Sequence, residues 1–280
     1  MRKRMLGVIG HPIRHSLSPL MHNTVFKNLK LNYTYNAFDV KEGELDNRME
    51  DFRKNFVGIN VTIPHKVNVI RHLNQLSEEA RLIGAVNTVK FGEETVGYNT
   101  DGMGCVRAFE EAGIRIRNKK MLILGAGGAA RALAFQLTKE KAEIWISDKI
   151  KERAFELAKD VEEKLGRKTH TIVLEDKPLR DAIDKVDIVI NATPVGMHPN
   201  VNESPIEPEW LRREITVMDI IYNPAETKLL KWAKKIGCNT IDGVGMFVNQ
   251  GAESLRIWLG IEPPLEVMRS IVLEALKKKA

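Results

Sequence analysis

The sequence is poor in cysteine, in aromatic residues and in long apolar runs. Cys105 and Cys238 are its two cysteines, and Phe, Trp and Tyr together make up 6% of the 280 residues. Two isolated cysteines lack both the paired spacing of a zinc site and the density of a disulfide framework, so we expect reduced thiols and no metal. No stretch approaches the roughly 18 apolar residues of a membrane helix, and the run at 5–9 ends too early for a signal peptide. These absences favour a cytoplasmic protein without a membrane partner.

Charge is abundant and of both signs. Lys and Arg number 43 against 37 Asp and Glu, which gives a formal net charge of +6. The two signs interleave along the chain, as on an ordinary solvated surface. The excess suits an anionic ligand such as a nucleotide or a carboxylate. Nucleic acid is not an expected partner, because no clustered basic stripe or reading motif accompanies the charge.

Short apolar runs alternate with segments of helical period along the whole chain, which predicts an α/β fold with a largely parallel sheet. The expected strands are 5–9, 33–40, 57–62, 88–91, 95–98, 121–124, 142–147, 169–173, 187–191 and 216–220. The expected helices are 19–29, 43–54, two pieces within 64–84, 101–111 and a pair after 245. Further helical stretches lie between the later strands.

The length of 280 residues, 43% of them hydrophobic, favours two domains. The polar segment 115–120 precedes a fresh strand, so we place the change of domain in the helix before it. We expect an α/β domain over 1–103 and a Rossmann-type nucleotide-binding domain over 104–243. The C-terminal helices, over 244–280, are expected to pack back on the first domain.

A glycine-rich segment indicates the nucleotide site. Gly125-Ala126-Gly127-Gly128-Ala129-Ala130 follows an expected strand, opens an expected helix and fits the pattern G-x-G-x-x-G/A. In that pattern Gly125 permits a tight turn, Gly127 lets a pyrophosphate approach the backbone, and Ala130 allows close helix–strand packing. The alternative is a tight turn without a ligand. The spacing of strand, helix and second strand favours the dinucleotide, whose pyrophosphate would meet the positive end of the helix.

The type of nucleotide is less clear. Asp148 ends the second strand of this unit, about 20 residues after the glycines, where an acid accepts from the ribose 2′-hydroxyl of NAD. It would repel the 2′-phosphate of NADP, whereas Lys149 and Arg153 are placed to neutralise that phosphate. Asp148 could also be the N-cap of the next helix. The cofactor signal is therefore mixed.

Four short motifs carry polar side chains at junctions of strands and helices, where open α/β folds bind their ligands. In SLSP, Ser16 and Ser18 could bind a carboxylate, or Ser18 could simply cap the helix that Pro19 begins. Asn87 in GAVNT and Asp101 in YNTDG are, taken singly, turn or cap residues.

The remaining motif is NVTIPHK, in which we expect Pro64 to begin a helix. Lys66 would then stand at the positive end of that helix, a position that prefers acids. A lysine there would give up its proton readily, or it would turn into solvent.

The motifs SLSP, NVTIPHK, GAVNT, YNTDG, GAGGAAR, NATPVGM and DGVGMFVNQGA occur in this order over nearly the whole chain. In this combination the chain resembles the shikimate dehydrogenase family. The resemblance implies a substrate domain, a Rossmann domain and hydride transfer between NADP and shikimate or 3-dehydroshikimate. It implies no metal and leaves the oligomeric state open between monomer and homodimer.

The resemblance also implies roles for individual residues. Lys66, paired with Asp101, becomes the group that takes and returns the hydroxyl proton. The implied substrate contacts are Ser16, Ser18 and Tyr222 at the carboxylate, and Thr62, Asn87, Asp101 and Gln250 at the ring hydroxyls. The implied cofactor contacts are Gly125, Ala126, Gly127, Gly128 and Ala129 at the pyrophosphate, and Ile220 and Gly243 at the nicotinamide end.

One segment departs from the family's NADP-dependent members, which usually carry Asn-Arg-Thr where this chain has Asp148-Lys149-Ile150. In relatives that also oxidise quinate, an acid at this place accompanies NAD. We expect NADP and shikimate, and an NAD-dependent quinate/shikimate dehydrogenase is the alternative. A non-catalytic nucleotide sensor is a remote alternative, because Lys66 and Asp101 both stand in intact motifs.

Overall fold

The computed structural model describes residues 4–278, and the chain divides into two compact units. The first unit holds the described residues through Asp101 together with those from Val248 onward, and the second holds Gly102–Phe247. The two divisions fall at the start of helix α4 (Asp101–Glu111) and within helix α9 (Gly243–Leu259). Each unit is built around its own sheet of six strands.

The sheet of the first unit is mixed, in the order β2-β1-β3-β5-β6-β4. Its first three strands are parallel, and β5 runs antiparallel to both β3 and β6. The hairpin between β5 and β6 was expected from its Gly-containing turn. The strands are β1 (Arg4–Gly10), β2 (Tyr33–Asp39), β3 (Phe56–Val61), β4 (Gln75–Leu76), β5 (Thr88–Lys90) and β6 (Val96–Tyr98).

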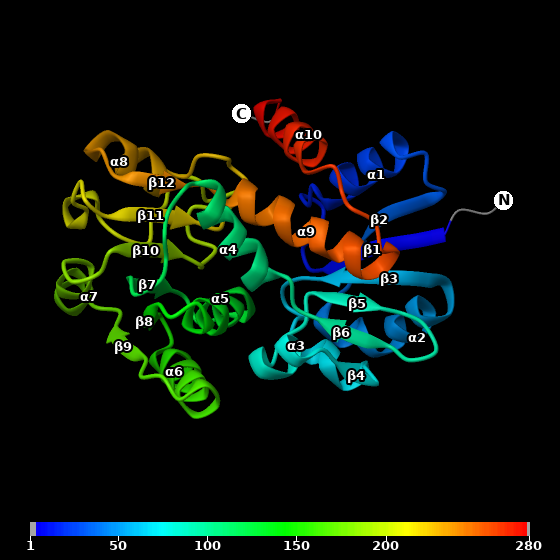
Figure 1. Cartoon of the computed structure of the whole chain (residues 1–280), viewed down its shortest axis with the longest axis horizontal. Helices are drawn as coiled ribbons and strands as arrows, with labels where there is room; N and C mark the ends of the chain where they lie inside the picture. The colour runs from blue at the N-terminus through cyan, green and yellow to red at the C-terminus, as the bar shows by residue number, and fades with distance from the viewer. Residues whose placement is uncertain (1–3, 279–280) are drawn as a thin grey trace. The chain divides into compact units, whose positions relative to one another are not determined.

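Helices from both ends of the chain cover this sheet. The C-terminal helix α10 (Leu265–Lys277) packs against α1 (Ser18–Asn28), so the last helix of the chain belongs to the first unit, as expected (Figure 1). Helix α2 (Leu45–Asn55), preceded by the 3₁₀ turn η1 (Glu42–Glu44), buries Leu45, Met49 and Phe52 on its inner face. This spacing of four and three residues is that of an amphipathic helix.

The segment after Pro64 differs from the two expected helices. It forms a turn, the 3₁₀ helix η2 (Asn68–His72), the short strand β4 and helix α3 (Glu78–Ile83). Asn74 exchanges hydrogen bonds with Thr95 next to β6, and this pairing draws the chain into the sheet. No helix therefore begins at Pro64, and the expectation that Lys66 stands at a helix N-terminus is wrong.

The sheet of the second unit is parallel throughout, in the order β12-β11-β10-β7-β8-β9. This is the doubly wound order of dinucleotide-binding folds, with the switch in strand order between β7 and β10. The three-residue edge strand β12 was not expected. The strands are β7 (Lys120–Leu124), β8 (Glu143–Asp148), β9 (His170–Val173), β10 (Ile188–Asn191), β11 (Thr216–Asp219) and β12 (Asn239–Ile241).

Helices separate these strands, as the right-handed crossovers of a parallel sheet require. Strands β7, β10 and β11 carry buried residues at nearly every position, because helices cover both faces of such a sheet. The helices are α5 (Gly128–Lys139), α6 (Lys151–Leu165), α7 (Asp176–Ile183) and α8 (Lys228–Ile236), with the 3₁₀ turn η3 (Pro208–Trp210) before β11.

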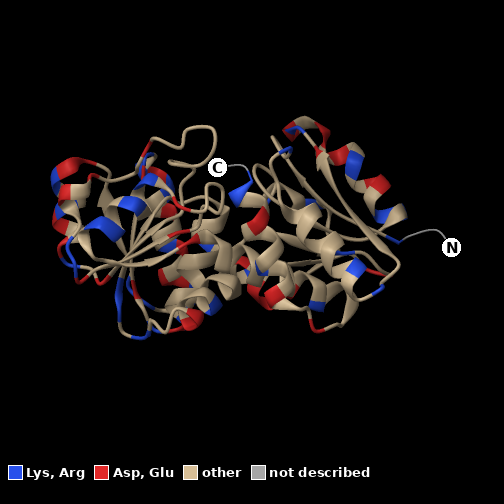
Figure 2. Cartoon of the chain, turned by 90° about the horizontal axis from the view of Figure 1, so that it is seen from above, with Lys and Arg blue, Asp and Glu red and all other residues tan. Residues whose placement is uncertain are grey.

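Basic and acidic positions are interleaved along the helices of both units (Figure 2). Within residues 4–278, no helix is both long and apolar enough to cross a bilayer.

Candidate functional site

Lys66 and Asp101 form the centre of the candidate site. Lys66 lies in the turn that follows β3, and Asp101 is the first residue of α4. The Lys66 Nζ atom lies 2.6 Å from Asp101 Oδ2, and the two side chains are 13% and 7% exposed. Removing charges from water is costly unless they are paired, so each of these groups stabilises the other.

Asn87 holds the other oxygen of the Asp101 carboxylate. Its Nδ2 atom donates to Asp101 Oδ1 at 2.8 Å and to Thr100 Oγ1 at 2.9 Å. Its Oδ1 atom lies 2.9 Å from the backbone nitrogen of Thr100. Because a backbone N–H can only donate, the atom that faces it must be oxygen, which settles the orientation of the amide. Asp101 therefore has a donor on each oxygen.

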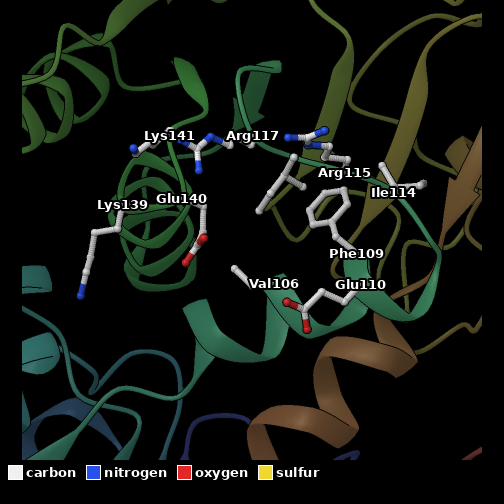
Figure 3. Close-up of a pocket in the computed structure, with 10 residues that line it drawn as sticks. Val106, Phe109, Glu110, Ile114, Arg115, Arg117, Lys139, Glu140 and Lys141 are labelled. Carbon is white, nitrogen blue, oxygen red and sulfur yellow. The ribbon is translucent and has the colours of Figure 1, made fainter.

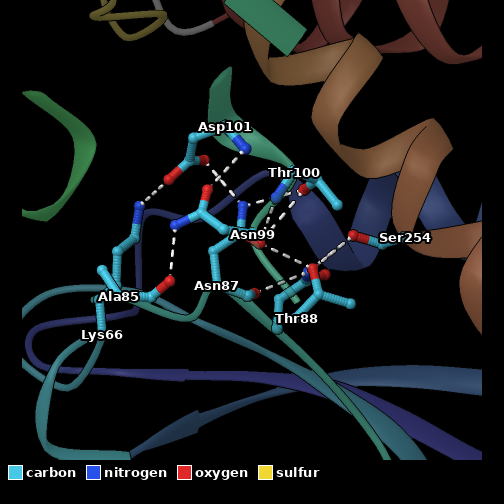
Figure 4. A network of polar contacts seen from close by, with 9 residues as sticks. Lys66, Ala85, Asn87, Thr88, Asn99, Thr100, Asp101 and Ser254 are labelled. Carbon is cyan, nitrogen blue, oxygen red and sulfur yellow. Dashed lines mark hydrogen bonds and ion pairs between the residues drawn. The ribbon is translucent and has the colours of Figure 1, made fainter. Parts of the chain in front are cut away.

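Hydrogen bonds to backbone groups join the segments that carry these three residues (Figure 4). The Asn99 side chain accepts from the N–H of Asp101 at 3.1 Å and donates to the carbonyl of Ala85 at 2.9 Å. The carbonyl of Lys66 accepts from the N–H of Val86 at 2.7 Å. The pair thus lies on a frame in which the turn after β3, the start of β5 and the start of α4 are held together.

Ser16 and Ser18 lie together at the start of α1. The Ser16 Oγ atom accepts from the N–H of Ser18 at 3.3 Å. The helix cap is Leu17, with no capping side chain, so the alternative in which Ser18 only caps the helix is wrong. In the described chain, the hydroxyls of Ser18 and Thr62 make no hydrogen bond with protein groups. These two hydroxyls are available to a ligand.

Gln250 lies half-buried on α9, in the first unit. Its carbonyl accepts from the Ser254 hydroxyl at 3.1 Å, and Ser254 Oγ lies 2.9 Å from Thr88 Oγ1. Thr88 in turn donates to Asn87 Oδ1 at 2.9 Å. Sequence reasoning gave no role to Thr88, although it ends the motif GAVNT, and it missed Ser254, because no motif marks that residue.

The glycine-rich turn follows β7, at the switch in strand order. Gly125 has φ +107°, and a Cβ atom there would lie 2.9 Å from the Ala192 carbonyl oxygen, so glycine is required. Gly127 is the N-cap of α5, and a Cβ atom there would meet nothing within 4 Å. The first N–H groups of α5 have no partner within the helix. This open helix start, with Gly128 and Ala129 in its first turn, fits a pyrophosphate.

Asp148 binds the glycine-rich turn directly. One carboxylate oxygen accepts from the N–H of Ala126 at 2.7 Å, and the other accepts from the N–H of Ile150 at 2.8 Å. The N-cap of α6 is Ile150, so the alternative in which Asp148 caps that helix is wrong. Lys149 and Arg153 are exposed beside it. A carboxylate has about four acceptor positions, so Asp148 retains capacity for a ribose hydroxyl.

The structure brings Ile220 and Gly243 together in the second unit. A Cβ atom on Gly243 would overlap the carbonyl oxygen of Ile220, so any larger residue would push the two segments apart. Tyr222 lies in the loop after β11 and stacks on Phe247, with ring centroids 4.1 Å apart. The segment with Ile220 and Tyr222 follows the end of β11, and the segment with Gly243 follows the end of β12. Nucleotide contacts in doubly wound folds also follow strand ends.

Asp219 at the end of β11 is a further residue that sequence reasoning missed. Its buried carboxylate accepts from the Thr227 hydroxyl at 2.7 Å, and from Ile221 N–H and the Asn191 side-chain amide at 3.1 Å each. Burial raises the pKa of Asp219 to about 6 despite these donors, which favour its ionised form. Through its hydrogen bonds with Ile221 and Thr227, Asp219 holds both ends of the loop that carries Ile220 and Tyr222.

A hollow of about 240 Å³ lies elsewhere in the second unit, and none of the motif residues lines it. Figure 3 shows Phe109 among the charged side chains of Glu110, Arg115 and Arg117. The hollow lies where the chain enters β7, whereas ligands of open α/β sheets bind at the carboxyl ends of strands. We therefore leave it outside the candidate site.

Three models of shikimate dehydrogenase domains each match a different part of the chain. The shikimate dehydrogenase substrate binding domain matches residues 8–89, and the shikimate/quinate 5-dehydrogenase family matches residues 107–228. The shikimate 5′-dehydrogenase C-terminal domain matches residues 243–273. Lys66 and Asn87 lie within the first match, and the glycine-rich turn lies within the second.

Whole-chain relatives carry the same names. The chain is 46% identical to the shikimate dehydrogenase (NADP(+)) of Methanocaldococcus jannaschii over 280 residues, 99% of each protein. A crystal structure of a shikimate dehydrogenase in complex with NADP⁺ is 45% identical, with a TM-score of 0.92 over 98% of this chain and 96% of that one. Quinate dehydrogenase from Corynebacterium glutamicum in complex with NAD is 31% identical, with a TM-score of 0.89 over 97% and 99%. With this similarity over its whole length, the chain belongs to the shikimate dehydrogenase family.

Proposed function

We propose that the chain is an NADP-dependent shikimate dehydrogenase, which reversibly reduces 3-dehydroshikimate to shikimate in the pathway to chorismate and the aromatic amino acids. The observation that carries the proposal is the Lys66–Asp101 pair, 2.6 Å apart and held by Asn87. Oxidation of a secondary alcohol needs one group that removes the hydroxyl proton, and the amine of a partly buried lysine oriented by a carboxylate is such a group.

Each residue of the site then has a role in the chemistry. Bound NADP supplies the acceptor for hydride. During oxidation the uncharged amine of Lys66 takes the hydroxyl proton, and during reduction the ammonium so formed returns it. Asp101 orients the lysine and the hydroxyl together. The substrate carboxylate is bound by Ser16, Ser18 and Tyr222, and the ring hydroxyls by Thr62, Asn87, Asp101 and Gln250.

The two units contribute different groups in this proposal. The first, over 1–103 with the returning helices 244–280, supplies the substrate contacts other than Tyr222, and the second, over 104–243, binds NADP and supplies Tyr222. In the second unit Gly125, Ala126, Gly127, Gly128 and Ala129 hold the pyrophosphate, Asp148, Lys149 and Arg153 surround the adenosine ribose, and Ile220 and Gly243 lie at the nicotinamide. We place the enzyme in the cytoplasm, as a monomer or a homodimer.

The function is tested by mixing the purified protein with shikimate and following reduced nicotinamide by absorbance, with NADP and NAD in parallel. We expect turnover with shikimate and a higher kcat/KM with NADP. Faster turnover of quinate with NAD would instead assign the chain to the alternative, a quinate/shikimate dehydrogenase. A folded protein that turns over neither substrate would refute both and favour a nucleotide-binding sensor.

Asp148→Asn is expected to raise the ratio of kcat/KM with NADP to kcat/KM with NAD by about tenfold, which corresponds to about 1.4 kcal/mol. The reason is that a carboxylate repels the 2′-phosphate of NADP and accepts from the 2′-hydroxyl of NAD. The matched variant Lys149→Gln removes a neighbouring cation and is expected to lower the same ratio. A ratio that Asp148→Asn leaves unchanged would restrict Asp148 to holding the N–H groups of Ala126 and Ile150.

A further inference from the structure

A chain of buried hydrogen bonds continues behind Asn87, away from Asp101, and ends on α9. Thr88 Oγ1 lies 2.9 Å from Asn87 Oδ1 and 2.9 Å from Ser254 Oγ. The Asn60 Nδ2 atom lies 2.9 Å from Ser254 Oγ and 3.0 Å from Thr88 Oγ1. Thr88 and Ser254 are both fully buried, so no solvent replaces these contacts. Figure 4 shows the contacts running from Ser254 to Lys66.

The direction of these hydrogen bonds follows from proton counting. Asn60 Nδ2 lies 3.1 Å from the backbone carbonyl oxygen of Asn87. A carbonyl oxygen only accepts, so the Asn60 atom that faces it is the amide nitrogen. Asn60 Oδ1 therefore accepts from the Tyr35 hydroxyl, at 2.7 Å. Asn60 has one remaining proton for the hydroxyls of Thr88 and Ser254.

The hydroxyl protons are determined in the same way. Asn87 Oδ1 is an acceptor, because it faces a backbone N–H, so the single hydroxyl proton of Thr88 points at Asn87. The contact between Thr88 and Ser254 must then be donated by Ser254. The Ser254 hydroxyl is thus an acceptor for Asn60 and a donor shared between Thr88 Oγ1 and the Gln250 carbonyl.

We propose that Ser254 is a positioning residue for the Lys66–Asp101 pair, because it directs the Thr88 proton onto Asn87 and so keeps the Asn87 Nδ2 atom on Asp101. This proposal rests on the function proposed above. Ser254 touches none of the reacting groups, and its effect passes through Thr88 and Asn87. The same hydroxyl bonds the carbonyl of Gln250, so it fixes α9 and the frame of the pair together.

Two further hydrogen bonds join this part of α9 to strand β5, the strand that begins at Thr88. The Trp258 indole N–H donates to the carbonyl of Val89 at 2.9 Å, and Lys90 Nζ donates to the carbonyl of Ile257 at 2.8 Å. These bonds involve neither Asn87 nor its neighbours in the hydrogen-bond chain. Loss of the Ser254 hydroxyl alone is therefore expected to leave α9 in place and to loosen the Asn87 amide.

The test is the variant Ser254→Ala, assayed with shikimate and NADP for kcat and KM separately. We expect kcat to fall about threefold to tenfold, the range for one buried hydrogen bond, with KM changed less than twofold. Thr88→Val removes the next hydroxyl, and its loss in kcat should not add to that of Ser254→Ala in the double variant. A control is Thr24→Val, because Thr24 also donates from a helix to the carbonyl four residues earlier, at 2.8 Å, outside this network.

Each outcome has a separate meaning. A lowered melting temperature with unchanged kcat in Ser254→Ala, or fully additive losses in the double variant, would overturn the positioning role. If wild-type protein turned over no shikimate, the proposed function would fail. The positioning role would then be decided by a crystal structure of Ser254→Ala: a rotated or doubled Asn87 amide supports it, and an unmoved amide rejects it.

Discussion

Lys66→Ala is expected to lower kcat for shikimate oxidation by about 10²–10⁴-fold, the usual contribution of general acid–base catalysis, with little change in KM. In the structure Lys66 Nζ lies 2.6 Å from Asp101 Oδ2. In the reaction as we propose it, the uncharged amine of Lys66 accepts the hydroxyl proton and thereby becomes the ammonium. Steady-state kinetics with shikimate varied at saturating NADP measures both constants. A loss confined to KM would move Lys66 from proton transfer to binding.

Two further variants make this result specific. Lys54→Ala removes an exposed lysine of the same unit, paired with Glu50 on α2, and is expected to leave kcat unchanged. Asp101→Asn removes the charge that orients Lys66. Because the two residues act as one unit, the double variant Lys66→Ala with Asp101→Asn should be little slower than either single variant.

The second large effect concerns His22, at the centre of the first unit. Its ring is fully buried and stacks on Tyr35 with centroids 4.4 Å apart, and neither ring nitrogen has a hydrogen-bond partner among residues 4–278. Burial lowers the pKa of His22 from 6.5 to about 3. The His22 ring binds its second proton more tightly in the unfolded chain than in the folded one. The stability contributed by neutral His22 is therefore complete above pH 6.5 and is lost as the pH falls towards 3.

His22→Leu is therefore expected to be stabilising, and more so in acid. The replacement has a similar volume and removes unpaired buried polar atoms. The variant has no group that titrates at this position. Its advantage over wild type in the free energy of unfolding is therefore expected to be about 3 kcal/mol larger at pH 4 than at pH 7. Denaturant unfolding of both proteins at the two pH values measures this difference. The matched control is Met21→Leu, at a buried neighbour of His22 on α1 that carries no titrating group, which should change the free energy of unfolding equally at the two pH values. Parallel pH curves for His22→Leu and wild type would contradict the expectation.

Local patterns were sufficient to predict most of the fold. Apolar runs predicted ten of the strands to within about two residues, because most of these strands carry buried residues in one of the two sheets. The pattern failed after Pro64, where bonds between Asn74 and Thr95 outweigh the local preference for helix. It also gave no sign of β12, a three-residue strand that exists because β11 is beside it.

The candidate site divides in the same way. Lys66, Asn87 and Asp101 could be predicted because their motifs, taken together, resemble those of the shikimate dehydrogenase family. Ser254 could not, because its partner Thr88 is 166 residues away in the sequence and only the folded chain brings the two hydroxyls together. Asp219 was missed for another reason: a single acid at the end of a strand does not show that it will be buried.

The division of the chain has a consequence for how the protein is made. The second unit is one continuous segment, Gly102–Phe247, whereas the first is assembled from both ends of the chain. During synthesis the ribosome completes the second unit while the first still lacks α10, the Trp258 anchor and the Ser254 hydroxyl. Domains generally fold as units in the order in which they emerge. We therefore expect the second unit to fold first, and the first unit, which carries Lys66 and Asp101, to be completed only after the segment that begins at Val248 has been translated.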